Sequence, residues 1–208
     1  MFRPLITAAI LAIAGASAVP AAVMRFDDVW ANFGAFDDTL GDIANLDVSN
    51  RTRNDFGNAS VYEEHLEHWR RNYSDLRDVA FPSAPGKVGE LAFAPDAGYS
   101  VTIESFDIGT WYNGAPKIGS FFIYDSSWNV LWSLENTLFA GNSITVFPNV
   151  TGAAYFQWGK NWDIGIDNFK YSVAPAGNLA AVPLPASLPL LAFGLFGLVV
   201  LGLRRNRR

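Results

Sequence analysis

Hydrophobic and polar residues alternate along the second half of the chain, from Phe93 onward. In "AGYSVTIESFDIGTW", Val101 and Ile103 fall on one face of an extended segment, and Thr102 and Glu104 fall on the other. The run "IGSFFIYDSSWNVLWSL" predicts two short strands around an Asp-Ser-Ser turn, which together form a hairpin. The period of the alternation is that of a half-buried strand.

Residues 142–173 predict three further strands. They are separated by turn-forming residues at Pro148-Asn149, at Gly152 and at Gly159-Lys160-Asn161. Short strands between Gly, Asn and Pro clusters are typical of an antiparallel β-sandwich or jelly roll. We therefore expect an all-β, jelly-roll-like sandwich over residues 23–173.

The first half of this body is less regular. "VMRFDDVW" is a candidate opening strand. "SVYEEHLEHWRRNYSDLRDVA" is the most helix-like segment, because Ser60 and Glu63 have capping-box spacing. Its apolar residues recur at helical spacing: Leu66, Trp69, Tyr73 and Leu76. This pattern predicts a short helix near 60–76, although residues 72–75 also fit a loop.

The N-terminal 22 residues have the pattern of a secretory signal peptide. Arg3 precedes an apolar run from Leu5 to Ala14, and small residues follow, with candidate cleavage sites after Ala18 and Ala22. The alternative is an uncleaved anchor helix. The apolar run is short for spanning a bilayer, which takes about 20 residues, so we favour export with cleavage.

The C-terminus has a linker and then a candidate transmembrane helix. Residues 174–181 carry no charge and are rich in Ala. The uncharged run from Val182 to Leu203 is 22 residues long, close to the length of about 20 that crosses a bilayer. Four arginines follow it: Arg204, Arg205, Arg207 and Arg208. Their charge would keep this end in the cytoplasm.

Charge and composition narrow the function of the body. The chain has 15 basic and 20 acidic residues, and five of the basic ones lie in the two end segments, which leaves a body of net charge −10. Such a body is a poor partner for nucleic acid or for an anionic membrane surface. The chain has no cysteine, which excludes disulfides, thiol catalysis and thiolate metal sites.

The proline motif of the C-terminal segment carries a family resemblance. Val182, Pro183, Leu184, Pro185 and Ala186 precede the apolar run and the arginine cluster, and this order resembles the VPLPA variant of the PEP-CTERM sorting signals. The resemblance covers residues 182–208. It implies export by the secretion machinery, tethering in the inner membrane of a Gram-negative bacterium, and processing by an exosortase. The alternative is an ordinary tail anchor.

The same resemblance implies a final location at the cell surface or in the extracellular matrix, in a bacterium that makes exopolysaccharide. The body itself is similar to exported β-sandwiches that accompany this signal, through "YSDLRDVAF", "GYSVTIESFDIGTW" and "WDIGIDNFKY". Those bodies resemble galactose-binding-like and carbohydrate-binding jelly rolls. The similarity establishes no activity.

Asp167 and Asn168 interrupt a predicted strand between two apolar stretches. The apolar face changes parity across the pair, which indicates a β-bulge. Ca²⁺ prefers carboxylate and carbonyl oxygens. A terminal strand beside the opening strand would bring Asp27 or Asp28 within reach, so the four residues are a candidate calcium site. The alternative is an Asx turn or a hydrogen-bonded structural Asp.

Trp111 and Trp162 are the candidate sugar-binding platform, because both fall in apparent loops, "GTWYNGAPK" and "GKNWDIG". Packing at the edge of the core is the alternative for both. Three other tryptophans fall in expected strands and are assigned to the core: Trp128, Trp132 and Trp158.

His65 and His68, with Glu64 and Glu67, resemble a fragment of a metal cluster, but a third ligand at a diagnostic spacing is missing. A solvated charged face is the favoured interpretation. The chain contains neither a Gly-x-Ser-x-Gly motif nor a phosphate-binding glycine loop.

These observations favour a non-enzymatic, exported β-sandwich that associates with polysaccharide. Two alternatives remain, a Ca²⁺-dependent carbohydrate-active enzyme and a purely structural surface protein.

The sorting interpretation predicts that the mature protein from the native host lacks Arg204 to Arg208, because processing removes the end of the signal. Intact-mass measurement of the surface form checks this. Detection of the full arginine tail on that form would instead show a simple anchor.

Overall fold

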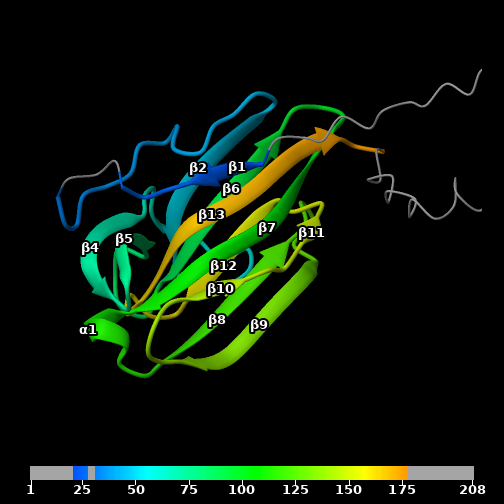
Figure 1. Cartoon of the computed structure of the whole chain (residues 1–208). Helices are drawn as coiled ribbons and strands as arrows, with labels where there is room; N and C mark the ends of the chain where they lie inside the picture. Colours follow the sequence, from blue (N-terminus) through cyan, green and yellow to red (C-terminus); the bar gives the residue numbers. More distant parts are fainter. Residues whose placement is uncertain (1–20, 28–30, 178–208) are drawn as a thin grey trace, which may run out of the picture. The chain divides into compact units, whose positions relative to one another are not determined.

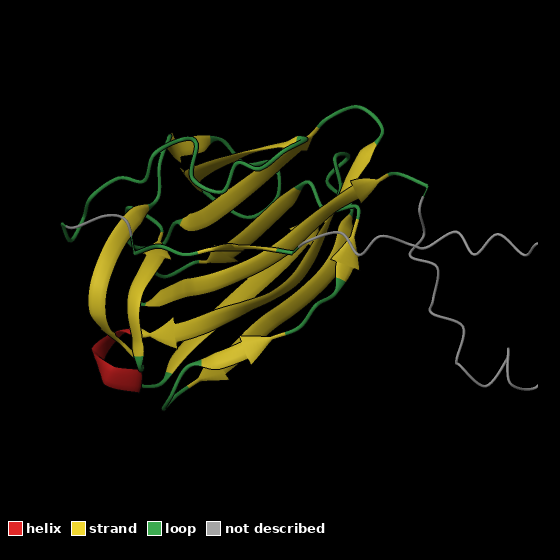
Figure 2. Ribbon diagram, turned by 45° about the horizontal axis from the view of Figure 1, so that its top comes forward, coloured by secondary structure: helices red, strands yellow, loops and turns green. Residues whose placement is uncertain are grey.

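The protein is described by a computed structural model that covers residues 21–27 and 31–177. The body is an antiparallel β-sandwich, as the alternation predicts (Figures 1 and 2). The predicted sorting segment and Asp28 lie outside the described residues, as does the predicted leader up to residue 20. Within the described ranges, no helix is long and apolar enough to cross a membrane.

One layer is a seven-stranded sheet in the order β10-β7-β13-β5-β4, with β1 paired to β13 and β11 paired to β7. Its strands are β1 (Ala22–Met24), β4 (Glu67–Tyr73), β5 (Leu76–Phe81), β7 (Tyr99–Thr110), β10 (Ile144–Val146), β11 (Val150–Thr151) and β13 (Ile164–Pro175). The long pair β7 and β13 forms its centre.

The other layer is a six-stranded sheet in the order β3-β2-β6-β12-β8-β9. Its strands are β2 (Leu46–Arg53), β3 (Val61–Glu63), β6 (Val88–Pro95), β8 (Lys117–Tyr124), β9 (Val130–Phe139) and β12 (Tyr155–Gly159). The hairpin predicted around the Asp-Ser-Ser turn is β8 and β9, which pair antiparallel. One short helix, α1 (Trp111–Gly114), follows β7.

Aromatic side chains dominate the core between the sheets. Phe106 lies 4.7 Å from Phe156 between ring centroids, and Phe156 lies 4.9 Å from Phe169. Trp158 is fully buried beside them. Its indole lies so close to Gly89 that a Cβ at that position would come within 2.7 Å of the ring. A glycine on β6 therefore makes room for the largest core side chain.

A second, smaller apolar cluster lies on the opposite face of the seven-stranded sheet. Ala80 belongs to the main core. Because side chains alternate along a strand, its neighbours Val79 and Phe81 point to the other face, where both are buried. Tyr73 stacks on Phe81 at 6.1 Å. The tryptophans at the α1 end, described below, lie on this face.

The helix predicted near 60–76 is wrong, because this segment forms β3, β4 and the start of β5. β4 and β5 pair antiparallel, with Trp69 opposite Val79, and a register shift lies between Arg70 and Tyr73. Both faces of this segment are covered, because Leu66 packs in the main core while Trp69 lies opposite Val79 on the other face. Apolar residues therefore occur on both faces, and their spacing imitates a helical period. Strand pairing supplies the contacts that outweigh the local pattern.

Candidate functional site

The outer face of the six-stranded sheet carries a buried ionic network around Glu90. Leu91 packs in the core, so alternation places Glu90 on the outer face, where it is nevertheless 0% exposed. Arg53 Nε lies 2.5 Å from Glu90 Oε2, and Arg51 Nε lies 3.3 Å from Oε1. Gln157 Nε2 donates to Oε2 at 2.6 Å. Three partners from two neighbouring strands thus compensate one buried carboxylate.

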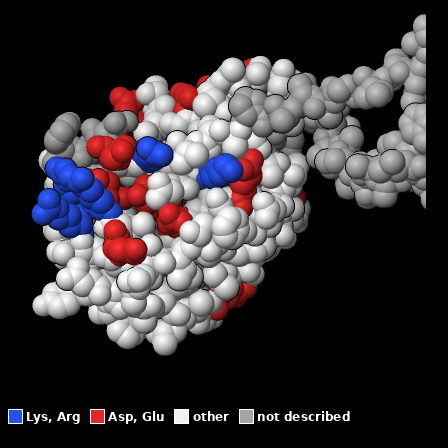
Figure 3. Space-filling view, viewed as in Figure 1, with Lys and Arg blue, Asp and Glu red and all other residues white. Residues whose placement is uncertain are grey.

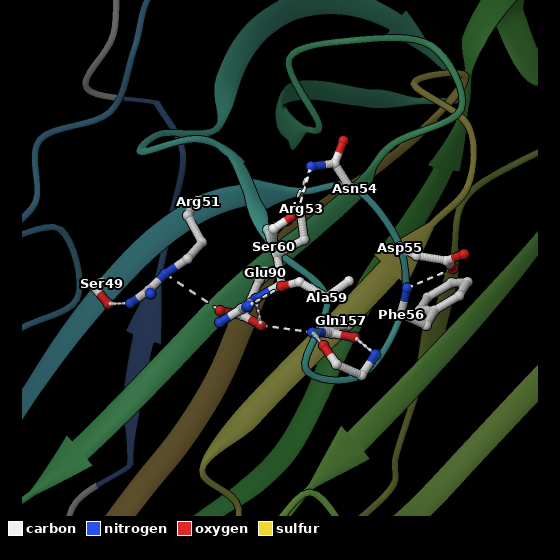
Figure 4. Close-up of polar contacts among 11 residues, drawn as sticks. Ser49, Arg51, Arg53, Asn54, Asp55, Phe56, Ala59, Ser60, Glu90 and Gln157 are labelled. Atoms are coloured by element: carbon white, nitrogen blue, oxygen red, sulfur yellow. Dashed lines mark hydrogen bonds and ion pairs between the residues drawn. The ribbon is translucent and has the colours of Figure 1, made fainter.

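The same network holds the loop of residues 54–60 against the sheet (Figure 4). The Gly57 amide donates to Gln157 Oε1 at 2.7 Å, and Gln157 Nε2 donates back to the Gly57 carbonyl at 3.0 Å. Arg53 Nη1 donates to the Ala59 carbonyl at 2.5 Å. Because these donors are fixed by the Glu90 network, the loop and its Phe56 side chain are held in one place.

A row of aromatic rings runs across this outer face from Phe56. Phe56 and Phe122 lie 4.8 Å apart, and Phe122 stacks on Tyr124 at 5.7 Å. Further along, Trp128 stacks face to face on Tyr155 at 3.9 Å. The Arg53 guanidinium lies 5.1 Å above the Trp128 ring. Trp128 is packed against Tyr155 and Arg53, whereas Phe56 and Phe122 line the groove described next.

An open groove of about 360 Å³ lies at the Phe56 end of this row. Its lining combines apolar and polar side chains: Phe56, Ile118, Gly119, Ser120, Phe122, Glu135, Asn136, Gly159 and Lys160. The residues come from the 54–60 loop, β8, β9, the end of β12 and Lys160 just after it. Apolar rings beside hydrogen-bonding side chains are a usual feature of a ligand-binding site.

A bulge in β9 places two polar side chains at the groove. The register between β8 and β9 shifts opposite Gly119–Phe121, and Asn136 has a φ of 49°. The Asn136 amide donates to Ser120 Oγ at 3.0 Å. In a regular strand Glu135 and Asn136 would face opposite sides, but the bulge lets both line the groove.

The charges at the groove are partly balanced. Lys160 Nζ lies 2.8 Å from Asp55 Oδ1, and this contact, with the Phe56 amide, holds the pKa of the Asp55 carboxyl below its usual range. Glu135 accepts a hydrogen bond from Ser133 at 3.0 Å. The groove therefore offers hydrogen-bond donors and acceptors beside two rings, without a strong net field.

Comparisons with known proteins find structural neighbours but no sequence relatives. Neither a protein-family model nor a curated protein matches the chain. One structural neighbour is the enzymatically active domain of tailspike protein 4 of bacteriophage CBA120. That domain has 16% identity and a TM-score of 0.23, with 65% of this chain covered. The match spans only 20% of the tailspike chain.

Two further neighbours are family 11 carbohydrate-binding modules of Clostridium thermocellum. One is in complex with a β-1,3-1,4-mixed-linked tetrasaccharide, with 12% identity, a TM-score of 0.27, and 77% of this chain and 99% of the module covered. The other belongs to the cellulosomal cellulase Lic26A-Cel5E, with 11% identity, a TM-score of 0.24, and coverage of 76% and 97%.

The structure brings Trp111 and Trp162 together, as neighbours at the end of the sandwich where α1 lies. Their ring centroids are 6.1 Å apart at 30°. Trp69 approaches Trp111 edge-on at 4.7 Å, and Phe81 lies 6.3 Å from Trp162. Both predicted tryptophans are only half-buried, so edge packing and partial exposure coexist here.

The assignment of the other three tryptophans to the core holds in part. Trp158 is in the core and Trp132 packs against it. Trp128 is a correction: it lies in the turn between β8 and β9 with a φ of 66°, and it stacks on the outer face. The Asp-Ser-Ser turn next to it in sequence was the available signal.

The predicted bulge at Asp167-Asn168 is present, because the register of β13 against β7 shifts between Asp167 and Lys170. Asn168 has a φ of 48°. β1 pairs with β13, as the calcium hypothesis requires of the opening strand. The Asn168 amide donates to Asp167 Oδ1 at 2.7 Å, and Asn168 Nδ2 donates to Asp107 Oδ2 at 2.8 Å.

The Asp167 carboxyl lies near two other acidic side chains, Asp107 and Asp27. Burial raises its pKa to about 6, and the charges of Asp107 and Asp27 add to the increase, while hydrogen bonds from the Asn168 and Phe26 amides oppose it. Asp107 stands directly opposite Asp167 on β7. Sequence reasoning missed Asp107, which only strand pairing brings close. Among the described residues, no three His, Asp or Glu side chains are grouped to hold a metal.

The prediction of a solvated histidine face is wrong for His68, which is 0% exposed. Its Nε2 lies 3.0 Å from Asp78 Oδ1 and its Nδ1 lies 3.2 Å from the Ala31 carbonyl. Phe36 packs edge-on against the imidazole at 5.9 Å. β4 is a strand, so His68 points inward while Glu64 precedes the strand and is exposed.

Replacing Asp167 by Asn should remove a pH-dependent loss of stability. The pKa of this carboxyl rises from 3.8 to about 6 on folding. Its contribution to stability is therefore fully present below pH 3.8 and is lost as pH rises through about 6. Above pH 7 the variant should exceed the wild type by about 1–3 kcal/mol in the free energy of unfolding. The difference should vanish near pH 3.5. Urea unfolding with chelator across this range measures it.

The matched control is Asp125→Asn. Hydrogen bonds from Asn129 and Ser127 lower the pKa of Asp125, so this substitution should bring no gain above pH 7. A pH profile of Asp167→Asn that parallels the wild type would contradict the assignment.

Proposed function

We propose that the body is a non-catalytic polysaccharide-binding β-sandwich, and that the groove on the outer face of the six-stranded sheet is its glycan site. The observation that carries the proposal is the placement of Phe56 and Phe122 in one groove with Ser120, Asn136 and Lys160. Aromatic rings pack against the apolar C–H face of a sugar, and the polar groups satisfy its hydroxyls.

The buried network below the groove supports this proposal. The Glu90, Arg53 and Gln157 contacts fix the 54–60 loop in advance. A ligand that binds a loop already in place does not have to order it, so more of the interaction energy remains as affinity. The ion pair of Lys160 with Asp55 favours an uncharged segment of polysaccharide in this groove.

Glu135 is the one carboxylate among the lining residues, and the neighbouring Asp55 is paired with Lys160. Glycosidases of the usual kind use two acids about 5–10 Å apart across the cleaved bond. The arrangement therefore favours binding over hydrolysis, and the enzymatic alternative is tested directly below.

Export and sorting complete the proposed function. The signal-peptide pattern of residues 1–22 and the VPLPA-type segment of residues 182–208 support delivery through the secretion machinery. The protein would be tethered in the inner membrane, processed by an exosortase, and released to the cell surface or matrix. There it would associate with exopolysaccharide.

Calcium is proposed as an accessory ion at Asp167, with Asp27, Asp28 and Asn168 as the remaining candidate ligands. The support is the pairing of β1 with β13 and the repulsion among the acids, which a divalent cation would relieve. Adding calcium to chelator-treated protein at pH 7 should raise the melting temperature. It should do so less in Asp167→Asn. An unchanged melting temperature in the wild type would refute the proposal.

A glycan array of the protein, paired with a turnover assay on the host exopolysaccharide and on mixed-linked β-1,3-1,4-glucan, tests the proposed function. We expect binding without turnover. Phe56→Ala and Phe122→Ala should each weaken binding at least tenfold, which corresponds to about 1.4 kcal/mol, because each removes one ring of the groove.

The control is Phe147→Ala, since Phe147 is 67% exposed and lies just after β10 of the other sheet. It should leave binding unchanged. Turnover that depends on one acidic residue would establish the enzymatic alternative, and a blank array would favour a purely structural surface protein.

A further inference from the structure

Several residues with a left-handed backbone conformation lie at the end of the sandwich where α1 is found. Arg71, Asn72 and Ser74 have φ values of 72°, 65° and 53°, and Tyr112 and Asn113 have values of 68° and 53°. This conformation is unfavourable for residues other than glycine. Backbone of this kind persists only where the surrounding structure holds it, and it concentrates at functional sites.

Hydrogen bonds join these two segments into one unit. An isolated bridge pairs Tyr73 with Trp111. The Ser74 amide donates to the Thr110 carbonyl at 2.8 Å, and the Thr110 amide donates to Ser74 Oγ at 3.0 Å. The Tyr73 hydroxyl donates to the Trp162 carbonyl. The turn between β4 and β5 is therefore fixed to the start of α1 and to the loop before β13.

Aromatic rings form the surface of this unit. Trp69 and Trp111 meet edge to face at 4.7 Å, and Trp111 and Trp162 lie 6.1 Å apart. Phe33 packs edge-on against Trp69 at 4.8 Å while remaining 56% exposed. Tyr112, held in its left-handed conformation, is 75% exposed. The left-handed turn thus presents a tyrosine to solvent beside a rigid tryptophan cluster.

Arginines border the same rings. Arg77 shares the face of β5 with Val79 and Phe81, and Val79 stands opposite Trp69. The Arg77 side chain is 66% exposed, and Arg71 is also exposed. Figure 3 shows Lys and Arg side chains gathered over β4 and β5 at the left of the view. On an acidic body, this is a local concentration of positive charge.

The carboxylate paired with Arg77 belongs to Asp78, which also contacts His68 and Arg70. Asp78 lies 3.0 Å from His68, and its oxygens are 3.7 Å and 3.9 Å from the Nε atoms of Arg70 and Arg77. Its side chain is only 11% exposed. Arg71 is exposed and the Arg77 side chain is 66% exposed, so both guanidinium groups are accessible to a ligand as hydrogen-bond donors.

We propose that this end of the sandwich is a second binding site, which takes a carboxylate-bearing saccharide such as a segment of uronic acids. The aromatic–arginine end, defined here as Trp69, Arg71, Arg77, Trp111 and Tyr112, supplies both kinds of contact. Guanidinium groups bind carboxylates in two-pronged geometry, and the rings bind the C–H faces of the sugar. The site extends the proposed function but is separate from the groove.

The acidic body limits the ligand to one with spaced carboxylates. A dense polyanion would be repelled by the net charge of −10, which follows from the 20 acidic and ten basic residues of residues 23–203. A uronic-acid oligomer carries one charge per sugar and can place one or two of them on Arg71 and Arg77. This distinguishes the site from one for nucleic acid.

The test uses full-length protein and two matched probes. The first is a galacturonic-acid hexamer, and the second is the same hexamer after reduction of its carboxyl groups to alcohols. Calorimetry should show binding of the acidic probe that is at least tenfold tighter than that of the reduced one. Binding should weaken with salt, and it should change tryptophan fluorescence because two indoles, Trp69 and Trp111, belong to the site.

The double variant Arg71→Gln/Arg77→Gln should lose at least tenfold in affinity for the acidic probe, and Tyr112→Ala should lose several-fold. The matched control is Lys87→Gln/Lys170→Gln, which removes the same charge from β13 and from the loop before β6. It should bind as the wild type does. Circular dichroism and the melting temperature confirm that each variant folds.

Three outcomes overturn the proposal: equal binding of both hexamers, equal losses in the two double variants, or absence of binding to folded protein at millimolar probe. Phe122→Ala separates this site from the groove, because it should weaken binding of the neutral glycan and leave binding of the acidic hexamer unchanged. If the groove proposal fails, the protein does not bind the neutral glycan but still binds the acidic hexamer. If the present proposal fails, the protein still binds the neutral glycan, and only its binding of the acidic hexamer departs from the expected results.

Discussion

A carboxylate buried on the outer surface of a β-sheet constrains everything around it. Glu90 is shielded from water, so its charge must be met by Arg51, Arg53 and Gln157. Those partners also hold the 54–60 loop, and the loop sets Phe56 against Phe122. The shape of the groove thus follows from how one buried charge is compensated.

Irregular strands create the other distinctive places of the molecule. The bulge in β9 turns Glu135 and Asn136 toward the groove. The bulge in β13 follows Asp167, which regular pairing places opposite Asp107, and the register shift in β4 precedes the turn tied to α1. At such irregularities side chains depart from the strict alternation of a strand, as Glu135 and Asn136 do at the groove.

The two sheets also divide the surface between different chemistries. The six-stranded sheet carries rings beside balanced charges, as in the contact of Lys160 with Asp55. The end of the seven-stranded sheet near α1 carries rings beside exposed Arg71 and Arg77. A heteropolysaccharide with neutral and acidic segments has the chemistry to contact both.

By itself the sequence determined the all-β sandwich, the β8–β9 hairpin and the bulge at Asp167, because alternation and turn residues act locally. It missed the strand at His68, because apolar residues on both faces of this segment imitated a helical period. It also missed Glu90, Asp107 and Trp128, whose roles come from residues distant in sequence. Only the tertiary structure decided these, since pairing between strands chooses which side chains become neighbours and which charges lose their water.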